Sequence, residues 1–153
     1  MKCARLLACL SLLLLAACGG QVRHVFPPAV NVEQLSTPVS GAWTATVRLH
    51  NQSYDADVRF DHIRLKLSLG DVEAGQLDQD VALDVAERSS DVADVHFTPS
   101  QAVREKIAAD HGQLRYTITG TITISDEGRH PDDFDIDHSG WLSPVPGVAH
   151  MYR

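Results

Sequence analysis

Cysteine is scarce in this sequence: the chain has three, at positions 3, 9 and 18, and none beyond residue 18. The rest of the chain therefore has no disulfide and no thiol nucleophile, so its fold is expected to depend on a hydrophobic core. Long apolar runs are also absent. The run over residues 6–15 is much shorter than the roughly 20 residues of a membrane-spanning helix, so no retained transmembrane anchor is expected.

The first 18 residues combine a short basic start, an apolar run and small residues. Lys2 and Arg5 come first, and Leu15-Ala16-Ala17 stand directly before Cys18. This layout predicts a secretory signal over residues 1–17 that is cleaved before Cys18. It resembles the lipobox of bacterial lipoproteins, in which the cysteine sulfur receives a diacylglyceryl group. The resemblance implies lipidation of Cys18; a plain secretory signal with an incidental cysteine stays open.

Basic residues are few. Removal of residues 1–17 takes away two of the 13 basic residues and none of the 20 acidic ones, which leaves 136 residues, enough for one domain, with a formal charge of −9. Nucleic acid is therefore not an expected partner, because like charges repel. Without a basic patch beside Cys18, attachment to the membrane would come from the lipid chains. Lipoprotein sorting rules, applied to Gly19, imply the outer membrane facing the periplasm; a surface orientation stays open.

Past the signal, residues 18–28 are expected to form a tether that ends in Pro27-Pro28. From residue 29 on, apolar and polar residues alternate, which predicts β-strands. The clearest are Trp43–His50 and Leu114–Ile124, with Gly120 at an inward position. Residues 144–153 are expected to form a C-terminal tail. Further strands are expected near residues 29–35, 56–69, 72–75, 81–85, 95–97 and 133–142.

Two local features refine this pattern. Val58 and Phe60 share one parity and the apolar residues of 63–69 share the other, which predicts a β-bulge near Asp61-His62. Thr98-Pro99-Ser100-Gln101 fits a capping box with Thr98 as N-cap, which predicts a short helix near residues 99–110 that ends before Gly112. About seven short strands with one helix favour an antiparallel β-sandwich over residues 29–143.

Several of these segments resemble the type 2 late-embryogenesis-abundant family, whose domain is also called the water-stress and hypersensitive-response domain. They are Val47–Asn51, residues 63–75, Tyr116–Ile122 and Phe134–Gly140. The family has an Asn-Pro-Asn turn after the first of them, where this chain has Asn51 followed by Gln52 and Ser53. The resemblance covers residues 28–143. It implies a sandwich of the fibronectin-III or immunoglobulin type, no catalytic residues, and a role in desiccation or stress tolerance.

Eight histidines raise the question of a metal site. They lie at positions 24, 50, 62, 96, 111, 130, 138 and 150, and no two are spaced by two or four residues. That spacing would place two ligands on one face of a strand or helix. Solvated surface histidines are therefore expected, and no metal or other cofactor. A site that the fold gathers from distant histidines stays open.

An acidic segment partly mimics a calcium loop. Asp133, Asp135 and Asp137 match its first three ligands, but His138 replaces the sixth-position glycine and Pro144 the twelfth-position glutamate. Alternation with Phe134 and Ile136 instead predicts a strand with one acidic face, and such an edge strand resists aggregation. Calcium binding is not expected.

Enzyme motifs are lacking as well. No Gly-x-Ser-x-Gly elbow and no glycine-rich phosphate loop occur, so no catalytic residue is assigned. Trp43 shares the core phase of its strand, whereas Trp141 falls on the outward phase and is the candidate surface contact; its partial burial by the tail stays open.

We therefore expect a non-enzymatic, membrane-anchored periplasmic lipoprotein that protects proteins or the envelope under stress. The alternative is an accessory module that binds an envelope protein complex through a sheet edge or the face of Trp141. A hydrolase or metal enzyme stays open as a third class.

Overall fold

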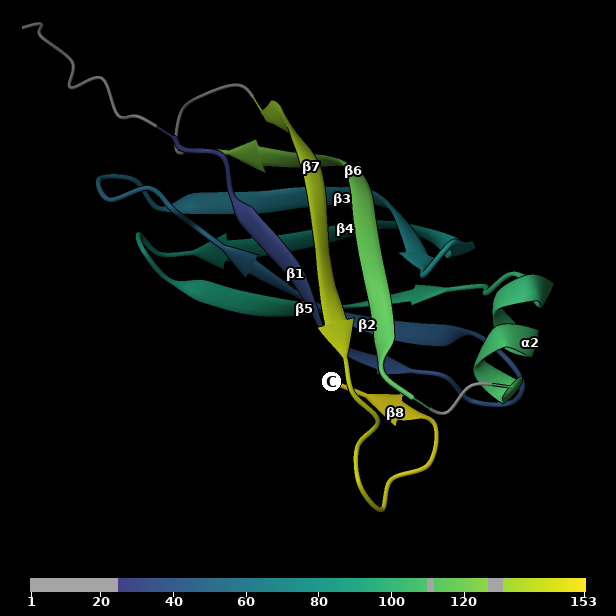
Figure 1. The fold of residues 1–153 in the computed structure, drawn as a ribbon. Coiled ribbons are helices and arrows are strands. Elements are labelled where there is room, and N and C mark those ends of the chain that lie inside the picture. Colours follow the sequence, from purple (N-terminus) through teal and green to yellow (C-terminus); the bar gives the residue numbers. More distant parts are fainter. Residues whose placement is uncertain (1–24, 110–111, 127–130) are drawn as a thin grey trace, which may run out of the picture.

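The computed structural model describes residues 25–109, 112–126 and 131–153. Within them, two four-stranded sheets face each other and every paired strand is antiparallel (Figure 1). The first sheet has the order β5-β2-β1-β8 and the second the order β4-β3-β6-β7. The elements are β1 Ala29–Ser36, β2 Trp43–His50, β3 Val58–Leu69, β4 Val72–Val85, β5 Ser90–Phe97, α2 Gln101–Ala109, β6 Leu114–Ser125, β7 Asp132–Leu142 and β8 Met151–Tyr152.

The prediction of an antiparallel β-sandwich with one short helix is confirmed, but the described residues hold eight strands rather than seven. The additional strand β8 lies in the expected C-terminal tail, where Met151 pairs with Ser36 and Tyr152 with Leu35. Two residues are too few to show an alternating pattern, and Tyr152 is buried where it pairs with Leu35 of β1. Tertiary pairing therefore made this strand.

Strand β4 also differs from the prediction. The expected strands near residues 72–75 and 81–85 are one strand, Val72–Val85, which pairs with the length of β3. The pairing register between β3 and β4 shifts between Phe60 and His62 of β3. Ala82, which lies in β4 opposite this shift, has a positive φ of 48°. The neighbouring strand holds these irregular residues in place, although their sequence does not alternate cleanly.

The predicted β-bulge near Asp61-His62 is confirmed. The register of β3 shifts between Phe60 and His62 against both β4 and β6. Phe60 lies in the core before the shift, and Ile63 and Leu65 lie in it afterwards. The extra residue therefore lets one strand bury two sets of apolar side chains that lie at positions of opposite parity.

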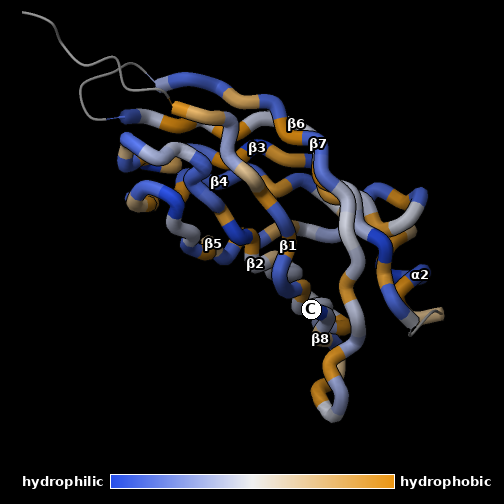
Figure 2. Tube along the Cα trace, turned by 60° about the vertical axis from the view of Figure 1, so that its left-hand side comes forward, coloured by the Kyte–Doolittle hydropathy of each residue, from blue (hydrophilic) through white to orange (hydrophobic). Residues whose placement is uncertain are grey.

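The core lies between the inner faces of the sheets and contains most of the alternating apolar side chains. Hydrophobic and hydrophilic residues alternate along the strands in Figure 2. Trp43, predicted to be a core residue, is buried and meets the ring of Phe97 edge-on at 6.1 Å between centroids. The largest fully buried side chains are Trp43, Phe60, Leu35, Leu49, Ile63, Leu65, Leu67, Leu69, Leu77, Ile118, Ile122 and Leu142.

The helix cap differs from the prediction. Helix α2 begins at Gln101, and its N-cap is Ser100 rather than Thr98: the Val103 N–H donates to Ser100 Oγ at 3.3 Å. Ser100 also binds β4, because its N–H donates to Ala74 O at 2.8 Å and its Oγ donates to Glu73 O at 2.6 Å. These contacts to β4 place the helix start two residues later than the local motif indicates. The helix ends at Ala109.

Asn51 anchors the loop between β2 and β3. Its side chain is buried, and its Nδ2 donates to Ala56 O at 2.8 Å and Val85 O at 3.1 Å. Its Oδ1 accepts from Ser53 N at 2.9 Å. The asparagine that begins the turn in the resemblance above thus has a structural role, since it satisfies backbone groups of two segments.

Candidate functional site

The outer edge of β7 leaves a run of backbone groups unpaired among the described residues. β7 pairs with β6 on one side, and no described strand pairs with its other side. In an antiparallel strand, the N–H and C=O of one residue point to the same side, and successive residues alternate. The side that each residue of β7 faces can therefore be assigned from a few hydrogen bonds.

Two hydrogen bonds make this assignment. Gly70 N donates to Arg115 O at 2.7 Å, so the odd-numbered residues of β6 face β3 and its even-numbered residues face β7. Just beyond β7, Ser143 N donates to Arg153 O at 2.7 Å on the outer side, which shows that odd-numbered residues face outward. The outward backbone groups of β7 belong to Asp133, Asp135, Asp137, Ser139 and Trp141.

Three of these odd-numbered residues of β7 carry acidic side chains. Asp133 accepts a hydrogen bond from Thr123 Oγ1 at 2.7 Å, and among the described residues no ion pair neutralises Asp133, Asp135 or Asp137. The basic residues of β3 are paired with acids of β4 instead, as in the 2.8 Å contact between Lys66 Nζ and Glu73 Oε2. The outer face of the second sheet therefore carries its uncompensated negative charge on β7.

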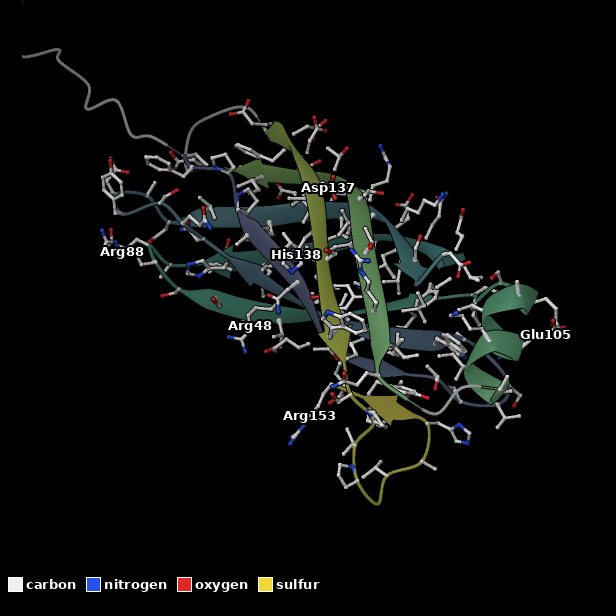
Figure 3. The ribbon with its side chains drawn as sticks, in the orientation of Figure 1. Arg48, Arg88, Glu105, Asp137, His138 and Arg153 are labelled. Carbon is white, nitrogen blue, oxygen red and sulfur yellow. The ribbon has the colours of Figure 1, made fainter. Side chains whose placement is uncertain are left out.

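A groove of about 410 Å³ lies directly beneath this edge, between β7 and β1. Its lining is mixed: Ala29, Val30 and Ile136 are apolar, and the polar residues Asn31, Asp135, Asp137 and His138 also line it. His138 is labelled in Figure 3. The His138 ring lies 6.0 Å from the ring of Tyr116, measured between centroids. The groove offers apolar contacts to side chains that point inward from the edge.

Tyr116 closes the inner end of this groove. Its Oη accepts a hydrogen bond from Val32 N at 3.3 Å and so satisfies a donor on the free edge of β1. Burial raises the pKa of the Tyr116 hydroxyl above its ordinary value, and the hydrogen bond from Val32 partly opposes this rise. The neutral phenol is thus the form that the fold favours.

Alkaline pH is expected to weaken the fold through Tyr116. The unfolded chain releases this proton at about pH 10. Since the folded pKa is higher, stability that is complete below that pH is lost as pH rises through the folded pKa. Tyr116→Phe should remove this part of the loss and, through the missing bond to Val32, cost about 1 kcal/mol near neutral pH. Denaturant unfolding across the alkaline range measures both effects.

The exposed Tyr54 supplies the matched control. Tyr54→Phe makes the same chemical change at a side chain that is 55% exposed, so comparison of the two variants isolates the effect of removing a buried hydroxyl. An alkaline slope that Tyr116→Phe leaves unchanged would contradict the role assigned to the buried hydroxyl.

A second hollow, of about 600 Å³, lies beside α2 at the end of the sandwich. Trp43, Ile107 and Tyr152 give it apolar walls, and its size is in the range of small-molecule sites. The Arg104 guanidinium lies 5.7 Å from the centre of the Trp43 ring and donates to Val39 O and Gly41 O. Because this arginine is bound to its own chain, the hollow offers mainly apolar contact.

Comparisons with known proteins do not place the chain in a family. No family model and no curated protein matches it. Two solved structures match with low scores. The first is the crystal structure of a protein from Archaeoglobus fulgidus, whose sequence is 11% identical to this one; the alignment covers 78% of this chain and 98% of that chain, with a TM-score of 0.45. The second is the solution structure of AT1g01470 from Arabidopsis thaliana, whose sequence is 12% identical to this one. The alignment covers 80% of this chain and 88% of that chain, with a TM-score of 0.47. These scores are too low to bear on function.

The residues singled out from the sequence lie in different parts of the fold. Trp141 is 64% exposed, on the outward phase as predicted, at the end of β7. Asp133, Asp135 and Asp137 follow one another along this extended strand, as the alternation predicted, rather than around a loop. Cys18 and the signal and tether residues up to 24 lie outside the described residues, so lipidation at Cys18 stays a prediction.

The histidines of the described residues are dispersed. His62 lies between two carboxylates of β4, with Nδ1 2.6 Å from Asp80 Oδ1 and Nε2 2.9 Å from Asp78 Oδ1. His50, His96, His138 and His150 lie in other surroundings, while those at 24, 111 and 130 are outside the described part. In that part of the chain, no group of three His, Cys, Asp or Glu residues is arranged to hold a metal ion.

The described helices include none with the length and apolar character needed to cross a membrane. Sequence reasoning identified Trp141 and the acidic phase of β7 but not the groove under this edge or the hollow beside α2. The groove depends on β1 and Tyr116, which are distant from β7 in sequence. Alternation along β7 was the only available signal, and it reports the faces of a strand but not its edges.

Proposed function

We propose that this protein is a non-enzymatic lipoprotein of the cell envelope, anchored by lipid on Cys18, with its sandwich in the periplasm at the outer membrane. The lipobox supports the anchor. Val25, the first described residue, follows Cys18 by seven residues, so the intervening chain spans at most about 25 Å. The end of the sandwich that carries Val25 would lie near the bilayer, and α2, at the opposite end in Figure 1, would point away from it.

The role we propose for the domain is protection of other proteins or of the envelope during desiccation or related stress. The resemblance to the type 2 late-embryogenesis-abundant family motivates this role. The observation that carries it is the outer face of the second sheet, where Thr117, Thr119, Thr121 and Thr123 lie between acidic β7 and the charged residues of β3. Such a face holds water and keeps the domain dispersed at high concentration.

Drying tests the protective role. A labile enzyme dried and rehydrated with residues 19–153 should recover more activity than with an equal mass of serum albumin, without forming a stable complex. This segment is suitable because one core connects Val30 to Tyr152. Recovery equal to that with albumin would reject the protective role. The matched control is the same segment carrying Gly120→Ala, whose fold we expect to be less stable. A recovery that falls with the stability of the fold would separate folded-state protection from the effect of bulk polypeptide.

The edge of β7 favours a second candidate, an accessory module that binds a protein complex of the envelope. Unpaired backbone groups and the exposed ring of Trp141 lie on one strand, and exposed aromatic residues are common at interfaces. Cross-linking in cells followed by affinity capture should then give one partner at constant stoichiometry. Weak, variable capture of many proteins would favour the protective role instead.

A further inference from the structure

We propose that the outer edge of β7 binds an extended, basic segment of another protein, which adds to the second sheet as a fifth strand. The proposal rests on the second candidate function above and names the chemistry of its partner. Three features carry it: the unpaired backbone of β7, the charge of its outer side chains, and the groove beneath it.

Parts of the other sheet edges are covered by neighbouring segments. On the opposite side, β4 and β5 lie together, and Gln79 Nε2 donates to Asp94 O at 3.2 Å. On the near side, β8 pairs with Leu35 and Ser36, and Tyr116 Oη accepts from Val32 N. β7 also lies close to β1, but among the described residues no backbone hydrogen bond is made on the outer side of its odd-numbered residues 133–141. Unpaired edges of this kind accept added strands.

The charge on β7 decides which strand would be accepted. Opposite charges directly across a strand pair are stabilising and like charges are destabilising. A second copy of this chain would bring its own β7, so Asp135 and Asp137 would face aspartates. A partner strand with lysine or arginine at alternate positions would instead neutralise these carboxylates. The occupant is therefore a basic segment of a different protein rather than another copy.

The groove determines which side chains fit on the inner face of the partner strand. Side chains that alternate with the basic ones would point inward, over Ala29, Val30 and Ile136. Small or medium side chains suit this position, where apolar residues share the lining of the groove with Asn31 and His138. At the end of β7 the exposed Trp141 ring lies on the same outer face as the aspartates, where it can cover a lysine or arginine side chain. The partner is thus a strand that alternates basic and apolar residues.

The test uses the mature, lipid-anchored protein in phosphatidylcholine vesicles and a short peptide that alternates lysine and valine. We expect saturable binding of one peptide per chain, seen as a change in Trp141 fluorescence; the buried Trp43 serves as an internal reference. Amide hydrogen exchange should slow at the odd-numbered residues 133–141 and stay unchanged at the even-numbered ones, which already pair with β6. A peptide with glutamate in place of lysine should bind at least about tenfold more weakly.

Two variants and a matched control test the geometry. Asp137→Lys should weaken binding of the lysine peptide by about tenfold, whereas Glu105→Lys, an equal charge change on α2, should have little effect (Figure 3). Ser139→Pro removes one outward N–H while leaving the bonds to β6 intact, and should also weaken binding. Circular dichroism confirms that each variant is folded; if the proline variant is not, Asp137→Lys alone decides the matter.

The outcomes separate this proposal from the function on which it rests. Absence of binding, equal binding of the glutamate peptide, or slowed exchange only outside β7 would overturn the proposed edge site. Self-association through β7, seen as a concentration-dependent dimer that Asp137→Lys strengthens, would overturn the choice of partner. A stable cross-linked partner found in any of these cases would leave the accessory-module function standing without this edge as its site.

Discussion

Replacing Gly120 by alanine is expected to lower the free energy of unfolding by about 4 kcal/mol. Gly120 has a φ of +146°, and a Cβ placed there would meet Arg64 O at 2.3 Å and Leu65 Cα at 3.0 Å. Both atoms belong to the backbone of β3, which is held between β4 and β6 and cannot move aside. The melting temperature should therefore fall by more than about 10 °C.

Gly41→Ala is the matched control for this prediction. Gly41 also has a positive φ, +88°, but apart from its chain neighbours no described residue lies within 4 Å of the position that a Cβ would occupy. Its replacement should cost only the backbone strain, about 1 kcal/mol. Thermal and denaturant unfolding of both variants separates strain from steric conflict. Equal losses would contradict the close approach of β6 to β3.

Replacing Cys18 by alanine is expected to move the protein almost completely out of the membrane fraction. Two acyl chains suffice for stable attachment, and the sequence offers neither a basic patch nor a long apolar helix as a substitute. Fractionation of washed membranes, with labelling by radioactive palmitate, measures the loss. Cys9→Ala is the control, because it changes a cysteine within the signal and leaves the lipobox unchanged.

The same variant should fold normally. Among the described residues the core runs from Val30 to Tyr152, so the free energy of unfolding should change by less than about 0.5 kcal/mol. A Cys18→Ala protein that remains in washed membranes would reject the lipid anchor. A variant that leaves the membrane but is unfolded would show instead that the attachment supports the fold.

Local patterns predicted the parts of the fold that local chemistry controls. The change of parity between Phe60 and Ile63 gave the β-bulge, because inward and outward side chains must alternate along a strand. The alternation at Trp43–His50 and Leu114–Ile124 predicted both strands and the burial of Trp43. In these segments the burial of apolar side chains and the backbone geometry favour the same structure.

Predictions failed where a distant segment decided the local structure. Thr98 fits an N-cap by spacing, yet Ser100 caps the helix because its backbone and side chain are also bound to β4. The break expected between residues 75 and 81 is absent, since pairing with β3 continues β4 across it. Strand β8 pairs with Leu35 and Ser36, which come far earlier in the chain, and a bridge also joins Tyr152 to Pro144. Most of these partners are too distant in sequence for a local pattern to reveal them.

The amino-acid sequence by itself determined the sandwich class, the inward and outward residues of the main strands, and the prediction of lipid attachment at Cys18. The strand assignments follow from a period of two that the main strands carry within themselves. The prediction for Cys18 follows from the residues that precede it and their resemblance to a lipobox. Only the tertiary structure decided that the acidic residues of β7 lie on an uncovered edge above a groove. Whether an edge is covered depends on which strands become neighbours, and that choice is made by packing of the whole core rather than by any one segment.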